Sequence, residues 1–346
     1  FTDPRERAQA IGVWGGVVGL SMAVGPVVGG ALVDAVGWRF IFWINVPVTL
    51  AAVLMTALFV PESRAAVPRR IDPVGQVLVV LLLGGLTYGI IEGRSAGWGS
   101  PLIIGCFLMC AVAAVSLVYY ERRRDQPLLE PRFFRSAPFS GATLIAVFGF
   151  SALSGFLFLN SLYLQSVRGF SALHAGLLTL PMAAMTVVFA PISGWLVGHR
   201  GPRVPLVVAG TMLTASGLIL SRLTTSTPVL PLLIGYLVFG LGFGMLNAPI
   251  TNAAVSGMPR AQAGVAAAIA STSRQVGASL GVAVAGTVLT ARLVGSFESG
   301  FVDAAKLCWF IIAGCGLMVL VLGLITTTQW ARRTAASVAD DLVKVG

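Results

Sequence analysis

Charged side chains are scarce in this sequence. Of its 346 residues, 10% are charged and 56% are hydrophobic, whereas roughly a quarter of the residues in a soluble domain are charged. The apolar residues form continuous blocks, each long enough to span the core of a bilayer as a helix. This composition excludes an ordinary soluble domain and predicts a polytopic membrane protein.

Signatures of catalysis and of metal binding are also missing. The sequence has two histidines, far apart, and it has neither a phosphate-binding glycine loop that ends in Lys-Ser or Lys-Thr nor a nucleophile elbow. The net charge of +10 lies in short loops rather than on one basic face, which argues against nucleic acid as a partner. We therefore expect no enzyme, no cofactor and no metal. Four cysteines lie inside apolar blocks, where small soft side chains pack well: Cys106, Cys110, Cys308 and Cys315.

Ten apolar blocks are long enough to cross a bilayer. All 13 carboxylates lie outside these blocks, and Arg274 is the only basic residue inside one. This distribution is expected, because an unpaired charge at mid-bilayer costs several kcal/mol. The sequence thus predicts an all-α polytopic membrane protein with spans at residues 11–33, 40–60, 73–91, 101–120, 138–165, 174–197, 204–221, 228–255, 262–291 and 307–330.

Lysine and arginine are distributed unevenly between the two sides of these spans. Counted loop by loop, 16 lie on the side of the starting segment and 6 on the opposite side, with Arg274 between them. Because basic loops stay in the cytoplasm, both ends of the chain are predicted to be cytoplasmic. High Ala, Gly, Val and Arg usage with few Lys indicates a GC-rich bacterial gene, and hence a location in the plasma (inner) membrane.

The first block ends in a glycine-rich segment, residues 25–30, with the sequence Gly-Pro-Val-Val-Gly-Gly. Small residues four apart let another helix approach closely, and the proline permits a bend. Residues 37–47 follow with Gly-Trp-Arg-Phe-Ile-Phe-Trp-Ile-Asn-Val-Pro. Together the two segments resemble the antiporter motif on the fifth helix of the major facilitator superfamily, and its continuation in the 14-spanning drug:proton antiporter subfamily. The motif residues are Gly25, Pro26, Gly29 and Gly30.

The resemblance implies a domain organisation. If residue 11 opens the fifth helix, ten helices end at the fourteenth, so about ten of an implied fourteen helices would be present and the first four would be missing. The implied parts are the fifth and sixth helices of an N-terminal six-helix bundle at 1–62, an extra central helix pair at 63–120, a cytoplasmic linker at 121–137, a C-terminal six-helix bundle at 138–330 and a cytoplasmic tail at 331–346.

Residues 194–203, Gly-Trp-Leu-Val-Gly-His-Arg-Gly-Pro-Arg, resemble the repeated cytoplasmic gate motif of the superfamily. In that motif an acidic residue and a basic neighbour join two helix ends. Here Gly198 occupies the acidic position and His199 the basic one, so we expect a turn but no charge latch. The residues retained from the motif are Gly194, Gly201 and Arg203.

The resemblance also implies that the spans 138–165 and 228–255 face a central cavity. Each amide in them is either a hydrogen-bond partner of another helix, the favoured interpretation, or a substrate contact. Arg274 either lies at membrane depth, where it needs a counter-charge or a water-filled cavity, or it sits at the cytoplasmic interface, which the sequence favours. The candidate cavity residues are Asn160, Gln165, Asn247, Asn252 and Arg274. Core or lipid packing is favoured over a cavity wall for Phe148, Phe150, Phe156, Phe158, Phe239 and Phe243.

The function implied by the resemblance is secondary active efflux, in which drugs or other lipophilic small molecules leave the cell in exchange for protons by alternating access. No carboxylate lies within the ten blocks, so the residues that couple transport to protons would belong to helices that precede them in the family. The alternatives are an exporter of a dedicated metabolite and a truncated membrane protein that does not transport. The expected partners are the small-molecule substrate, protons and the lipid bilayer.

Overall fold

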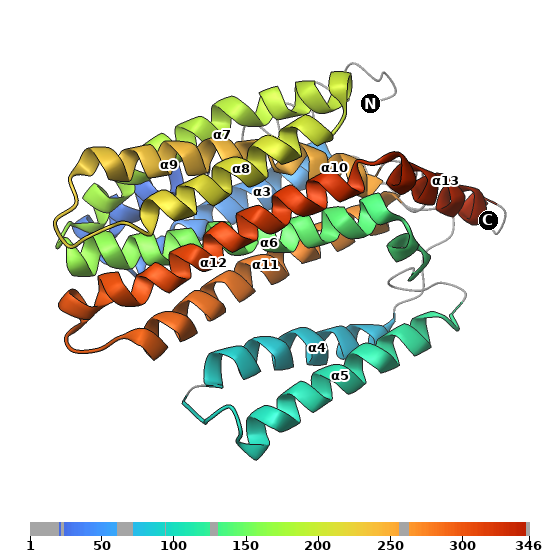
Figure 1. Ribbon diagram of the computed structural model, residues 1–346, viewed down its shortest axis with the longest axis horizontal. Coiled ribbons are helices and arrows are strands. Elements are labelled where there is room, and N and C mark those ends of the chain that lie inside the picture. The colour runs from blue at the N-terminus through green and yellow to red at the C-terminus, as the bar shows by residue number, and fades with distance from the viewer. Residues whose placement is uncertain are drawn as a thin grey trace.

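The computed structural model describes Ser21 and residues 24–60, 72–93, 95–124, 131–255 and 263–343. All regular elements in these ranges are helical (Figure 1), so the predicted all-α class is confirmed. Eight helices in the described part of the chain are long and apolar enough to cross a membrane.

The N-terminal part consists of a helix over Val24–Val36 followed by α2 (Phe40–Trp43) and α3 (Asn45–Phe59). Gly37 makes the turn between them, with a φ of 97° that side chains other than glycine rarely adopt. The predicted block 11–33 lies mostly outside the described residues. The second block is present as an apolar segment that α2 and α3 share.

The next two helices, α4 (Pro73–Glu92) and α5 (Pro101–Glu121), form an antiparallel hairpin that lies along one edge of the molecule (Figure 1). Both begin with proline, whose fixed φ suits a first helical residue, and both follow a polar residue that caps the first turn. The hairpin meets the rest of the protein at α11, where the hydroxyl of Thr287 donates to the carbonyl of Ile90 at 3.0 Å.

The remaining helices form a bundle of long, roughly parallel rods (Figure 1). A short 3₁₀ segment η1 (Pro131–Arg135) precedes it, and a single π-helical turn η2 (Tyr163–Val167) extends its first helix. The bundle helices are α6 (Ala137–Leu162), α7 (Ala172–Arg200), α8 (Arg203–Leu220), α9 (Val229–Gly244), α10 (Asn247–Val255), α11 (Ala263–Arg292) and α12 (Phe297–Thr326).

Two predicted spans differ from the structure, and a third contains a turn. The span 228–255 agrees with one apolar segment long enough to cross a membrane, Val229–Ala254, in which a turn at residues 245–246 separates α9 from α10. The span 307–330 begins ten residues early, at Phe297, where Ser296 caps the first turn and the charged side chains remain solvated. The span 262–291 is helical as α11, yet it is not among the eight helices with the composition of a membrane span. The tail beyond α12 is helical as well, as α13 (Gln329–Val343).

Close contacts between helices of the bundle depend on glycine. A Cβ on Gly277 would overlap the carbonyl of Val147 in α6, and one on Gly281 would overlap the carbonyl of Ser151. Gly281 follows Gly277 by four residues, and Ser151 follows Val147 by four residues, so α6 and α11 run parallel and in register. The hydroxyl of Ser151 also donates to the carbonyl of Gly277 at 2.8 Å. Small residues of this kind drive helix association in a membrane, because lipid is as apolar as the side chains themselves.

Candidate functional site

The exposed surface of α10 and α11 is polar. A helix that faces lipid presents apolar side chains, but apart from Val282 the residues exposed along α11 are small or polar, and α10 adds a hydroxyl and an amide. We call this surface the polar face. Its exposed members are Thr251, Asn252, Ser271, Thr272 and Gln275, and its half-buried members are Asn247 and Arg274.

Arg274 lies at the centre of the polar face. One of its terminal nitrogens donates to the hydroxyl of Thr251 at 2.8 Å, which joins α11 to α10. Its guanidinium carbon lies 5.9 Å from the centre of the Phe150 ring on α6. The Nε atom is buried and has no hydrogen-bond partner. Three helices therefore surround a partly desolvated cation.

The sequence left two positions open for Arg274, at membrane depth or at the cytoplasmic interface, and its place along α11 bears on both. Eleven residues separate it from the start of the helix at Ala263, which corresponds to about 16 Å of helix at 1.5 Å per residue. Its side chain packs against Phe150, which itself lies thirteen residues inside α6. Arg274 therefore lies well inside α11 rather than at its first turn, and its depth in a membrane stays a prediction.

The other candidate cavity residues divide into two groups. Asn247 and Asn252 lie on α10, the helix whose Thr251 bonds to Arg274, as parts of the polar face. Asn160 is instead buried in the core, where its Oδ1 accepts from the hydroxyl of Tyr236 on α9. Gln165 is exposed on η2 and donates to Ser161 at 2.9 Å. The structure therefore brings together three of the five candidates.

The sequence analysis missed Thr251 and Tyr236. Hydroxyl side chains are common in membrane helices, where they bond to their own backbone, so Thr251 gave no distinct signal. Tyr236 stands within a continuous apolar run of α9. Only the packing of α6 against α9 shows that its hydroxyl has a buried amide as partner.

Three of the six candidate phenylalanines are buried in the core, and the other three are half-buried. Phe156 stacks on Phe239 with ring centres 4.3 Å apart, and Phe243 is also buried. Phe150 is half-buried and meets the edge of Phe243 at 5.3 Å, so its other side is available to the polar face. Core packing was the favoured interpretation, and Phe150 is the member that contacts a polar-face residue.

The antiporter-like segment packs against the start of α7. A Cβ on Gly30 would overlap the carbonyl of Ala172, and one on Gly176 would overlap the carbonyl of Pro26. Gly25 and Gly29 face away from this contact, because a Cβ on either would meet no other group within 4 Å. The carboxylate of Asp34 accepts from the backbone N–H groups of Ala172 at 3.2 Å and Leu173 at 2.9 Å. A helix N-terminus attracts a carboxylate, so this contact ties the two segments together.

The gate-like loop forms the expected turn. Gly201 ends α7 with a φ of 80°, and Arg203 opens α8. Gly194 and Gly198 lie within α7. His199 bonds to the carbonyl of Trp195 at 2.8 Å and lies against its ring. Among the described residues, none of the ion pairs involves this loop.

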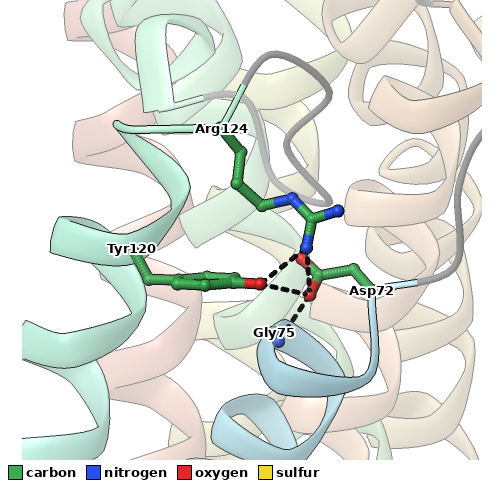
Figure 2. A network of polar contacts seen from close by, with 4 residues as sticks. All are labelled: Asp72, Gly75, Tyr120 and Arg124. Atoms are coloured by element: carbon green, nitrogen blue, oxygen red, sulfur yellow. Dashed lines mark hydrogen bonds and ion pairs between the residues drawn. The ribbon is translucent and has the colours of Figure 1, made fainter.

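A second polar cluster holds the open end of the α4–α5 hairpin (Figure 2). The carboxylate of Asp72 is almost fully buried and accepts from the backbone N–H of Gly75 at 2.9 Å and from Arg124 at 2.9 Å. Tyr120 donates to the same carboxylate at 3.3 Å and accepts from Arg124 at 2.6 Å. The hydroxyl of Tyr120 and the carboxylate of Asp72 raise the pKa of Arg124, which therefore stays charged.

Comparison with known proteins places these features in a family. The model of the family described as Major Facilitator Superfamily matches residues 1–282. A multidrug resistance protein of Mycobacterium tuberculosis is 35% identical over 298 residues, which cover 86% of this chain and 55% of the relative. The tetracenomycin C resistance and export protein of Streptomyces glaucescens is 36% identical over 303 residues, which cover 87% of this chain and 56% of the relative.

A third relative is the puromycin resistance protein of Streptomyces alboniger, which is 32% identical over 295 residues, covering 84% of this chain and 58% of the relative. The chain thus spans somewhat more than half the length of these curated relatives. All three come from bacteria, and each is named for resistance to, or export of, small toxic compounds.

Proposed function

The chain belongs to the Major Facilitator Superfamily, and on that premise we propose that it is a secondary active transporter that exports drugs or other lipophilic small molecules. The chain is a multi-pass membrane protein of bacterial type. The names of its relatives support a role in resistance to antibiotics, and they support a transporter rather than an enzyme.

We place the chain in the 14-spanning drug:proton antiporter subfamily, with both ends in the cytoplasm. The hairpin of α4 and α5 supports this assignment, because it lies beside the bundle rather than within it and so fits the extra helix pair at 63–120. The bundle from α6 to α12 fits the C-terminal half at 138–330. The segments 1–62, 121–137 and 331–346 would then be the end of the first half, the linker and the tail.

The observation that carries the proposal is the polar face. A surface of hydroxyl and amide groups on membrane-length helices is costly against lipid. It is expected where a helix lines an aqueous path, as it does in transporters that bind substrate between two helical halves near the bilayer midplane. Asn247 and Thr251 on α10, with Arg274 on α11, would contact substrate in that path.

Alternating access requires the two halves to move against each other. The contact of Gly30 with the start of α7 would be a pivot of this motion, because backbone packs directly on backbone there. Export would be driven by protons that move inward, with the coupling carboxylates outside the helices described above.

Accumulation of puromycin and tetracenomycin C in bacteria that lack their own efflux pumps tests this function. Energised cells that express the whole gene product containing this chain should hold several-fold less compound than cells with an empty vector, and a protonophore should remove the difference. Gly30→Leu should abolish export because its side chain cannot fit against Ala172. Gly105→Leu is the matched control, since no other group lies within 4 Å of that position.

Equal accumulation with and without the chain, across a broad panel of compounds, would count against drug export. A difference that survives the protonophore would instead count against proton coupling.

A further inference from the structure

Arg274 has an unfilled capacity to bind an anion. A guanidinium carries five N–H donors in a planar fork, and the hydroxyl of Thr251 accepts from one terminal nitrogen. The buried Nε has no partner. Of all the side-chain types, arginine is the one best suited to bidentate recognition of a carboxylate.

No carboxylate of the described residues neutralises this charge. The ion pairs in this part of the chain join Arg124 to Asp72 and Lys306 to Asp303, and both lie away from the polar face. A partly desolvated cation inside a membrane protein needs either a counter-ion or water. The neighbours of Arg274 on α6 and α10 supply a ring and a hydroxyl, neither of which carries a negative charge.

The surroundings of the guanidinium indicate what kind of anion would fit. Phe150 lies on one side of it and is itself backed by Phe243, so an apolar or aromatic body would find a ring to pack against. Thr251 and Asn247 lie on one face of α10, four residues apart, and offer polar groups beside the charge. The site thus combines a cation, polar groups and an aromatic wall.

We propose that Arg274, Thr251 and Phe150 form a binding site for organic anions in which a carboxylate or sulfonate is attached to an aromatic body. The anionic group bonds to the fork of Arg274, and the ring packs on Phe150. This inference rests on the proposed function, because it assigns the substrate class of the same transport path. The site selects acidic aromatic compounds over neutral or cationic ones.

Equilibrium dialysis with two matched probes tests the proposal without any transport. The whole chain is placed in nanodiscs of phosphatidylcholine, which has no net charge, and its binding of 1-naphthoate is compared with that of 1-naphthamide, after subtraction of empty nanodiscs. The two probes have the same ring system and differ in charge. We expect naphthoate to bind about tenfold more tightly, the factor typical of one charge-assisted hydrogen bond.

Substitutions then test whether Arg274 causes the preference for naphthoate over naphthamide. Arg274→Gln should reduce the preference to about one while the affinity for naphthamide stays within about twofold. Arg200→Gln removes the same charge from the exposed end of α7 and should leave the preference intact. Arg274→Lys keeps the charge without the planar fork, so part of the preference should remain. This variant keeps the test decisive if Arg274→Gln does not fold.

Three results would overturn the proposal: equal binding of both probes by the wild-type chain, an unchanged preference in Arg274→Gln, or loss of naphthoate binding when phosphatidylglycerol is added to the nanodisc. The last result would show that the site holds a lipid headgroup. Since binding is measured without a gradient, failure of the anion site leaves drug export standing, and failure of export in cells leaves the anion site standing.

Discussion

The helices α5 and α11 differ in the kind of residue that each exposes, and that difference indicates what surrounds each helix. Both are long enough to cross a bilayer, with 21 and 30 residues. The exposed residues of α5 are large and apolar, among them Leu102, Ile104, Leu108, Val112 and Val115. Apart from Val282, those of α11 are small or polar, among them Ala267, Ala268, Ser271, Thr272 and Gln275. Lipid selects the first kind of surface, and a protein-lined aqueous path permits the second.

Their packed surfaces differ as well. In α11, Gly277 and Gly281 bring the helix against the backbone of α6. The packed side of α5 contacts α4 through side chains: Met109 and Cys110 lie against Gly85, and the thiol of Cys110 points at the carbonyl of Leu82. Gly105 lies on the exposed side of α5, with no other group within 4 Å.

A carboxylate placed on each exposed surface gives the largest expected contrast. Val112→Asp puts a charge on a side chain that is 64% exposed on α5, and it should cost about 3 kcal/mol, the penalty for Asp at the centre of a membrane helix. Thr272→Asp on α11 should cost less than about 1 kcal/mol, because water reaches it. Thermal unfolding in nanodiscs measures both. Similar losses in the two variants would mean that α11 faces lipid.

A glycine in the close contact between α11 and α6, compared with an exposed glycine of α5, gives the next largest effect. Gly281→Ala should destabilise the bundle by about 2 kcal/mol, because the new methyl group overlaps the carbonyl of Ser151 and forces α6 and α11 apart. Gly105→Ala should be neutral or stabilising by up to about 1 kcal/mol, since alanine is the better helix former. Chemical denaturation of the two variants checks the difference. A stable Gly281→Ala protein would show that the helices are not packed at that distance.

The smallest effect is expected at the end of the hairpin. Arg124→Gln leaves the buried carboxylate of Asp72 with the N–H of Gly75 and the hydroxyl of Tyr120 but without its ion pair. Since Arg124 is itself partly exposed, the loss of stability should be small. It should appear as faster hydrogen exchange of the amide of Gly75, with no change in the bundle. Arg122→Gln, at an exposed position, is the control and should exchange like the wild type.

Hydrophobicity alone was enough to predict most spans. The blocks at 73–91 and 101–120 agree with α4 and α5 to within one residue at each end, because proline and a capping residue mark each start. The turn at residues 245–246 was not predicted, since the apolar sequence continues through it, but the span 228–255 agrees with the apolar segment Val229–Ala254. The start of α12 was placed too late because its first turns carry charges that a solvated helix end accepts.

The candidate site was predicted in part. Arg274 stood out as the single charge in a span, and the amides of α10 were recognised as polar groups in an apolar block. Their association with Thr251 and Phe150 was not visible, because hydroxyl groups and phenylalanines are common in membrane helices. Asn160 carries the same chemical group as Asn247, yet it is buried with Tyr236.

By itself, the sequence determined that the protein lies in a lipid bilayer, that it is helical and which family it resembles. Each of these depends on which residues occur and in what order. Only the tertiary structure decided which polar residues are buried partners and which face an open surface. That decision depends on how neighbouring helices are rotated about their axes, and the rotation is fixed by close contacts such as those of Gly277 and Gly281 with α6.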